Sequence, residues 1–203
     1  NNGLDLNRFK INKQKKLKIF KNNKFNILNM GRYNKIKGLE IQLQLIKKIN
    51  KFKDEFRIFF VGPNCKEKKK LIEKTEMLNL KKNVFFLPPI YSDKRFKMLY
   101  DCDLVINTSY YECNSMTILE SLASGGLVLA VENANVNHQF QYNALIKTKR
   151  NLNDLSNGIR LLKKNKKKQL KIRKNAILYA NRFLNINTLT NKYLKQYKSL
   201  IKS

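Results

Sequence analysis

The sequence is poor in features that several common kinds of protein need. Its three cysteines, Cys65, Cys102 and Cys113, are odd in number and lack metal-ligand spacing, which disfavours a disulfide framework and a zinc site and favours a reducing compartment. No apolar run reaches the roughly 18 residues of a membrane span. The longest candidate, 116–131, contains Glu120 and two glycines. We therefore expect no transmembrane helix.

Acidic residues are also scarce, with 14 Asp and Glu against 43 Lys and Arg, a formal net charge of +29. Such a field attracts nucleic acid, anionic lipid or acidic substrates. However, lysines are scattered among asparagines and isoleucines along the whole chain, so drift in composition explains the charge equally well. The densest clusters, 13–24 and 163–174, show no aromatic-interleaved RNA-binding signature and no helix-turn-helix. We do not expect nucleic-acid binding, and attachment to an anionic membrane surface stays open.

The beginning of the chain shows neither an apolar signal segment nor a starting Met, so we expect a piece of a longer protein with a part upstream missing. The 203 residues, 42% of them hydrophobic, suffice for one sizeable domain or two small ones. The single histidine, His138, has no partner evident in the sequence. We interpret it as a surface or packing residue rather than a general base.

The stretch 107–131 organises the chain. It follows the apolar run Leu104–Ile106, crosses a polar turn, enters a helical pattern, and leaves through two glycines into a second apolar run. This order predicts strand, turn, helix and strand, with Asn114 or Ser115 as the helix cap. Two carboxylates lie in this mostly uncharged stretch, Glu112 in the turn and Glu120 in the helix. Their placement predicts a binding site, although a surface helix with two solvated acids is the simpler alternative.

The two glutamates with seven residues between them, followed by Ser-Leu-Ala-Ser-Gly, resemble the signature of retaining, nucleotide-sugar-dependent glycosyltransferases of family 4, in the GT-B superfamily. The resemblance implies that Glu112 contacts the donor sugar and that Glu120 binds the nucleotide ribose. The start of the helix between them, residues 114–117, would face the diphosphate. Unpaired N–H groups at a helix start favour an anion, and a carboxylate can accept hydrogen bonds from a ribose diol. The binding residues so implied are Asn114, Ser115, Met116 and Thr117.

Further elements resemble the same family. Asn2-Gly3-Leu4-Asp5 with Arg8-Phe9 is similar to the segment that links the two halves of its members. Gly31-Arg32 and Lys37-Gly38 resemble an element in which Arg and Lys hold the donor diphosphate. Gly31 would let the backbone approach, Arg32 offers a planar fork and Lys37 a point charge. Arg32, Lys37 and Glu112 are thus the implied catalytic residues, although an Arg and a Lys are common in so basic a chain.

The turn after the third predicted strand, Pro88-Pro89-Ile90, lies against the base in the family, so the backbone of Ile90 is a candidate base contact. A rigid proline turn without a ligand is the open alternative. The chain departs from the family pattern at three positions, where Asn64 and Cys113 replace glycines and Leu127 replaces a frequent proline. A side chain at position 113 would crowd the donor sugar.

The pattern of elements predicts an α/β fold, a Rossmann-like doubly wound parallel sheet that forms the C-terminal half of a GT-B fold, with a helical C-terminal extension. Strands are expected at 25–30, 56–61, 84–87, 104–106 and before 131, with an edge strand at 143–146 and helices from 153 to 203. The predicted division is a linker and basic connection at 1–24, a nucleotide-sugar-binding domain at 25–185, and a helix at 186–203. That last helix would pack on a missing N-terminal, acceptor-binding domain.

The resemblance thus implies the donor-binding half of a hexosyltransferase-type enzyme that transfers sugar with retention, in polysaccharide, glycolipid or glycoprotein glycan synthesis. We expect a nucleotide sugar as donor, no cofactor, no metal, and a cytoplasmic location, with peripheral attachment to the inner face of the membrane or a lipid-linked acceptor as a further expectation. Two alternatives stay open. One is a basic Rossmann-like module for nucleic acid or anionic membrane, and the other is another GT-B enzyme such as a sugar-nucleotide epimerase.

Overall fold

The computed structural model describes residues 2–9, 11 and 15–201. Parts of the predicted linker 1–24 and of the predicted helix 186–203 lie outside the described residues, namely positions 1, 10, 12–14 and 202–203.

Within the described part of the chain, six parallel strands form one sheet in the order β3-β2-β1-β4-β5-β6. The chain adds strands outward from β1, returns across the sheet, and adds the remaining strands outward from β4. This order is that of a doubly wound Rossmann-like sheet, so the predicted fold class is confirmed. The strands are β1 (Phe25–Met30), β2 (Phe56–Val61), β3 (Val84–Leu87), β4 (Leu104–Asn107), β5 (Val128–Val131) and β6 (Ile146–Thr148).

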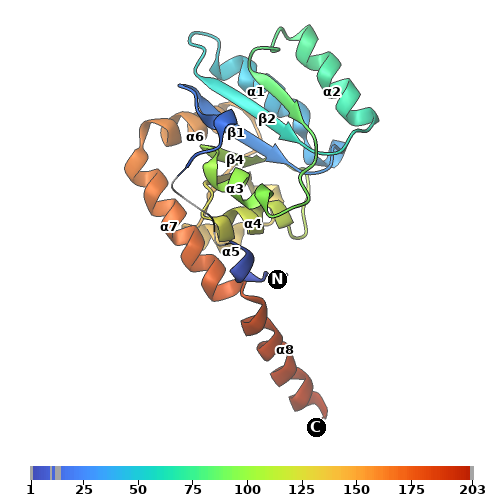
Figure 1. Cartoon of the computed structure of the whole chain (residues 1–203), viewed down its shortest axis with the longest axis vertical. Helices are drawn as coiled ribbons and strands as arrows, with labels where there is room; N and C mark the ends of the chain where they lie inside the picture. The colour runs from blue at the N-terminus through green and yellow to red at the C-terminus, as the bar shows by residue number, and fades with distance from the viewer. Residues whose placement is uncertain (1, 10, 12–14, 202–203) are drawn as a thin grey trace.

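Helices cover both faces of this sheet. α1 contacts α2 and α6, whereas α4 contacts α3 and α7. Figure 1 shows α1 and α2 on one side of the strands and α3 and α4 on the other. The helices are α1 (Leu39–Ile49), α2 (Lys66–Met77), α3 (Lys94–Asp101), α4 (Met116–Ser124), α5 (Asn137–Gln141), α6 (Leu152–Lys164), α7 (Lys166–Phe183) and α8 (Ile186–Ile201), with short 3-10 turns η1 (Leu6–Phe9), η2 (Lys18–Phe20), η3 (Lys35–Lys37) and η4 (Glu132–Ala134).

The core lies between the sheet and its helices. Strand β2, covered on both faces, is apolar at nearly every position, and its Phe59 and Phe60 are 2% and 0% exposed. Burying such a side chain contributes about 1.5–3 kcal/mol. Arg173 of α7 ties the ends of two other helices to this core, because its guanidinium donates to the carbonyls of Tyr100, Cys102 and Gly125 at 2.9–3.0 Å.

The two ends of the chain meet beside the core. Leu4 pairs with the joint between α7 and α8, where its N–H donates to the carbonyl of Leu184 and its carbonyl accepts from the N–H of Ile186. From this joint α8 extends away from the sheet (Figure 1), and none of its described residues is buried. Tyr193 and Tyr197 of α8 are 48% and 62% exposed. The helical pattern predicts that these aromatic residues are core residues or pack on a further domain. Their exposure shows that they are not core in the described structure, and packing on a further domain stays a prediction.

Three local expectations differ from the structure. The edge strand β6 begins at Ile146, the last residue of the predicted 143–146, because Asn143 has a left-handed φ of 51° and lies in the preceding turn. Ser115 is the cap residue of α4 but forms no side-chain cap hydrogen bond. His138 is a packing residue as expected, yet it has a partner, since its Nδ1 lies 2.6 Å from the hydroxyl of Tyr179.

Candidate functional site

The chain reverses its direction of winding between β1 and β4, and the loops that follow these strands meet there. Open parallel sheets bind ligands at such a point, outside the carboxyl ends of the strands. The two loops are joined directly, because the N–H of Tyr110 donates to the carbonyl of Ile36 at 2.7 Å and the hydroxyl of Thr108 donates to the carbonyl of Gly38 at 3.0 Å. Most of the predicted site residues lie on these two loops or at the start of α4.

Glu112 lies at the centre of this junction, with a side chain only 11% exposed. Lys37 donates to its Oε1 from 2.5 Å, Ser109 from 2.8 Å and Asn107 from 3.3 Å. Within the described residues no hydrogen bond reaches Oε2 of Glu112. The carboxylate is therefore fixed through one oxygen and can accept a hydroxyl group through the other.

Opposing effects act on the pKa of Glu112. Burial raises this pKa, but the hydrogen bonds from Lys37 and Ser109, the charge of Lys37 and the contact with Asn107 together lower it. The net pKa lies below the ordinary value. Glu112 is thus a carboxylate at neutral pH, and the structure pairs it with the same lysine that the sequence predicts for the diphosphate.

The start of α4 is held beside β1. The hydroxyl of Thr117 donates to the carbonyl of Met30 at 3.0 Å, and Asn107 reaches both Glu112 and the hydroxyl of Ser115, at 3.3 and 3.5 Å. Since no side chain caps the helix, its first N–H groups have no side-chain acceptor. This end of α4 can accept an anion.

Glu120, one turn further along α4, is 14% exposed and forms an ion pair with Arg95 of α3. Nη2 of Arg95 lies 2.9 Å from Oε1 of Glu120, and Nε lies 3.3 Å from each carboxylate oxygen. Sequence reasoning missed this partner, because a lone arginine in so basic a chain gives no signal.

The remaining predicted residues lie around the same edge. Gly31 has a φ of 149°, and a Cβ built on it would meet nothing within 4 Å. Arg32 is exposed, and its side chain forms no hydrogen bond or ion pair within the described residues. Asn114 and Ile90 are half-buried, and Met116 is 41% exposed. The turn that carries Ile90 is connected to the site through Arg95, whose Nη1 donates to the carbonyl of Tyr91 at 2.9 Å.

Cys113, which replaces a glycine of the family pattern, is exposed beside Glu112. Its sulfur lies 3.1 Å from the hydroxyl of Tyr111, and its carbonyl accepts from Asn135 at 2.8 Å.

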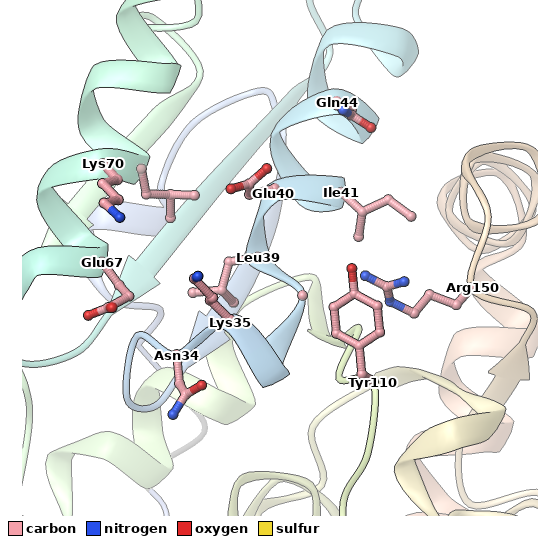
Figure 2. Close-up of a pocket in the computed structure, with 12 residues that line it drawn as sticks. Asn34, Lys35, Leu39, Glu40, Ile41, Gln44, Glu67, Lys70, Tyr110 and Arg150 are labelled. Atoms are coloured by element: carbon pink, nitrogen blue, oxygen red, sulfur yellow. The ribbon is translucent and has the colours of Figure 1, made fainter.

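A hollow of about 500 Å³ adjoins this junction, and none of the predicted site residues lines it. Figure 2 shows Tyr110 and Arg150 together at one side of it and Glu67 and Lys70 of α2 at the other. The guanidinium of Arg150 lies 3.4 Å from the ring centroid of Tyr110, so it covers one face of that ring.

Within the described residues, no group of three His, Cys, Asp or Glu side chains is arranged to hold a metal ion. No helix in the same residues is long and apolar enough to cross a membrane.

Comparison with known proteins identifies the family. The family model described as glycosyl transferases group 1 matches residues 10–179. The chain belongs to this family. A curated relative, N,N'-diacetylbacillosaminyl-diphospho-undecaprenol alpha-1,3-N-acetylgalactosaminyltransferase of Campylobacter jejuni, is 32% identical over an alignment of 116 residues that covers 53% of this chain and 29% of the relative.

Solved structures agree on the fold of this group 1 domain. Anabaena Alr3699/HepE in complex with UDP has a TM-score of 0.87 at 21% identity, over 97% of this chain and 56% of that one. The C-terminal domain of a group 1 protein, LpcC from Francisella tularensis, has a TM-score of 0.77 at 19% identity, over 91% of this chain and all of that one. The chain therefore spans about half the length of the HepE chain and less than a third of the curated relative. These matches support the GT-B type of fold that the resemblance implied.

Proposed function

We propose that this chain is the donor-binding half of a retaining hexosyltransferase, in which the edge between β1 and β4 binds a nucleotide-diphosphate sugar. The observation that carries the proposal is the convergence of Lys37, Glu112 and the uncapped start of α4 at the point where the sheet reverses. Cations and N–H groups suit a diphosphate, and carboxylates suit sugar hydroxyls.

Each predicted residue has a role in this proposal. Arg32 and Lys37, with the start of α4 at residues 114–117, bind the diphosphate. They stabilise the negative charge that it gains when its bond to the anomeric carbon of the sugar breaks. Glu112 orients the donor sugar and Glu120 accepts from the ribose. The backbone of Ile90 contacts the base. The proposal gives no role to a metal or other cofactor, because these cationic groups supply the charge.

The acceptor belongs to a part that this chain does not include. The HepE structure with a TM-score of 0.87 contains UDP, which supports a uridine nucleotide as the first donor to test. The name of the Campylobacter relative describes transfer to an undecaprenol-linked acceptor. We extend both to this chain as proposals, namely a nucleotide-sugar donor and a lipid-linked acceptor in glycan synthesis. A cytoplasmic position at the inner face of the membrane fits such an acceptor, and the charge of +29 fits anionic lipid there.

Calorimetric titration of the 203-residue chain with UDP, GDP and ADP at two salt concentrations tests the proposal. We expect selective binding of one nucleotide, weakened by about 1–3 kcal/mol in Glu120→Ala, the range for losing a buried hydrogen-bonding partner. Glu73→Ala, at an exposed glutamate of α2, is the matched control and should bind like the parent chain.

The alternatives give different results in the same experiment. Equal, salt-labile binding of all three nucleotides that ignores Glu120→Ala favours a basic module for nucleic acid or anionic membrane. A sugar-nucleotide epimerase converts its free donor without an acceptor. Incubation with UDP-glucose, followed by analysis of the sugar, identifies that case.

A further inference from the structure

Arg95 is a basic side chain that is held from several directions. Its side chain is only 18% exposed. The guanidinium reaches Glu120 with Nε and Nη2, and it reaches the carbonyls of Tyr91 and Ser92 with Nη1, at 2.9 and 3.3 Å. It therefore joins α4 to the turn that precedes α3.

The neighbours of Arg95 restrict it further. Its Cζ lies 4.2 Å from the ring centroid of Phe96, so the planar group stacks on an aromatic face. Asp93, the other carboxylate nearby, is bound by Arg8 at 2.5 Å and lies 3.8 Å from Nη1 of Arg95. Since Asp93 forms its shorter ion pair with Arg8, Glu120 is the main carboxylate partner of Arg95.

We propose that Arg95 is a positioning residue for the nucleoside part of the donor, which rests on the proposed function. It fixes the carboxylate of Glu120, which receives the ribose diol, and it is itself anchored through Nη1 to the turn that follows Ile90. A carboxylate offers about four acceptor sites, so the bonds to Arg95 leave room for ribose hydroxyls. Arg95 touches neither ribose nor base, and it acts through Glu120.

The fork geometry explains why an arginine is needed. One planar group donates in two directions, to a carboxylate and to backbone carbonyls, which the single ammonium of lysine cannot do with the same geometry. The effect of removing Arg95 should therefore depend on the ribose hydroxyls. A variant that merely loosens the fold would weaken all nucleotides alike.

The test measures affinities for UDP and for 2′,3′-dideoxyuridine 5′-diphosphate by calorimetry on the 203-residue chain. The variants are Arg95→Met, Arg95→Lys, Glu120→Ala and the double variant Arg95→Met with Glu120→Ala. Lys94→Met is the control, because it removes the same charge from an exposed neighbour on the same helix. Thermal unfolding of every variant is recorded in parallel.

We expect Arg95→Met to weaken UDP binding about tenfold, which corresponds to about 1.4 kcal/mol, and to leave the dideoxy nucleotide almost unchanged. Arg95→Lys should lose less affinity than Arg95→Met, and Lys94→Met should bind like the parent. In the Glu120→Ala background the Arg95 change should have little further effect. If Arg95→Met does not fold, Arg95→Lys answers the question with the same two nucleotides.

Equal weakening of both nucleotides, or full additivity of the two changes, overturns the role of Arg95. If the parent chain prefers UDP to the dideoxy nucleotide and only Glu120→Ala abolishes this preference, the proposed function stands and the Arg95 proposal fails. If the parent chain binds neither nucleotide, the proposed function fails and the Arg95 proposal fails with it.

Discussion

Lys37 and Glu112 form the ion pair at the centre of the proposed site, and together they account for much of its chemistry. Among the described residues, three side chains donate hydrogen bonds to Glu112 and all reach the same oxygen, which leaves the other for a sugar hydroxyl. A diphosphate bound at the start of α4 would contact the same Lys37. We therefore expect Lys37 to contact both the carboxylate that faces the sugar and the diphosphate that leaves.

The lowered pKa of Glu112 makes a prediction about stability and pH. A carboxylate whose pKa is lower in the folded chain stabilises the fold above its unfolded pKa, and this stabilisation is lost as the pH falls through the folded pKa. At pH 7, Glu112→Gln should reduce the free energy of unfolding by about 1–3 kcal/mol, because Lys37 loses its charged partner. The difference should shrink as the pH falls below the ordinary value of 4.5.

Urea unfolding of the parent chain and Glu112→Gln between pH 7 and pH 3 measures this difference. The other carboxylates with lowered pKa, such as Asp54 and Asp93, contribute equally to both proteins and cancel. A gap between the two curves that stays constant over this range would contradict the assignment.

At the scale of elements, the C-terminal ends of α3 and α4 are held in place by one side chain of α7. Arg173 of α7 donates to carbonyls at the C-terminal ends of α3 and α4, the helices that carry Arg95 and Glu120. These carbonyls have no partner within their own helices, and the negative end of each helix dipole favours a cation there. Arg173 thus fixes the two helices relative to each other.

We predict that Arg173→Met lowers the free energy of unfolding by about 2–3 kcal/mol, since hydrogen bonds to a charged group are lost and their carbonyl acceptors stay partly buried. Lys174→Met, at an exposed neighbour on the same helix, is the control and should change it by no more than about 0.5 kcal/mol. Guanidinium unfolding measures both. Equal effects would mean that Arg173 is an ordinary surface residue.

The elements differ in how well their sequences predict them. Strands β1, β2 and β3 have the predicted bounds because each is a short, mostly apolar run between polar segments, which leaves few alternatives. The edge strand β6 is only half-buried, so its pattern is weak and the prediction starts it too early, at Asn143 instead of Ile146. Glu112 could be predicted from a local spacing. Arg95 could not, because its role depends on Glu120, 25 residues away, which only the packing of α3 on α4 brings close.

At the scale of the whole molecule, the chain has the size of one half of its solved relatives. Helix α8 extends beyond the domain that the sheet builds (Figure 1), and its Tyr197 and Leu200 are 62% and 71% exposed. In the proposed enzyme this helix packs on the acceptor-binding half, as the resemblance implied. We expect the stability of the described domain not to depend on this helix.

We predict that ending the chain after residue 190 changes the free energy of unfolding by no more than about 0.5 kcal/mol, because residues 191–201, the described part of what is removed, are exposed. The pairing of Leu4 with Ile186 is kept in this shortened chain. Chemical unfolding tests the expectation, and Leu184→Ala, at a fully buried residue, is the positive control with an expected loss of about 2–5 kcal/mol. A large decrease in the free energy of unfolding on truncation would show that α8 stabilises the fold of this domain.

The most direct test of the central claim is a crystal structure of the chain with the nucleotide diphosphate that it binds. We predict the diphosphate at the start of α4, within reach of Arg32 and Lys37, with the ribose on Glu120 and the base beside Ile90. A nucleotide bound instead in the hollow beside Tyr110, or on a lysine-rich surface away from β1 and β4, would contradict the account.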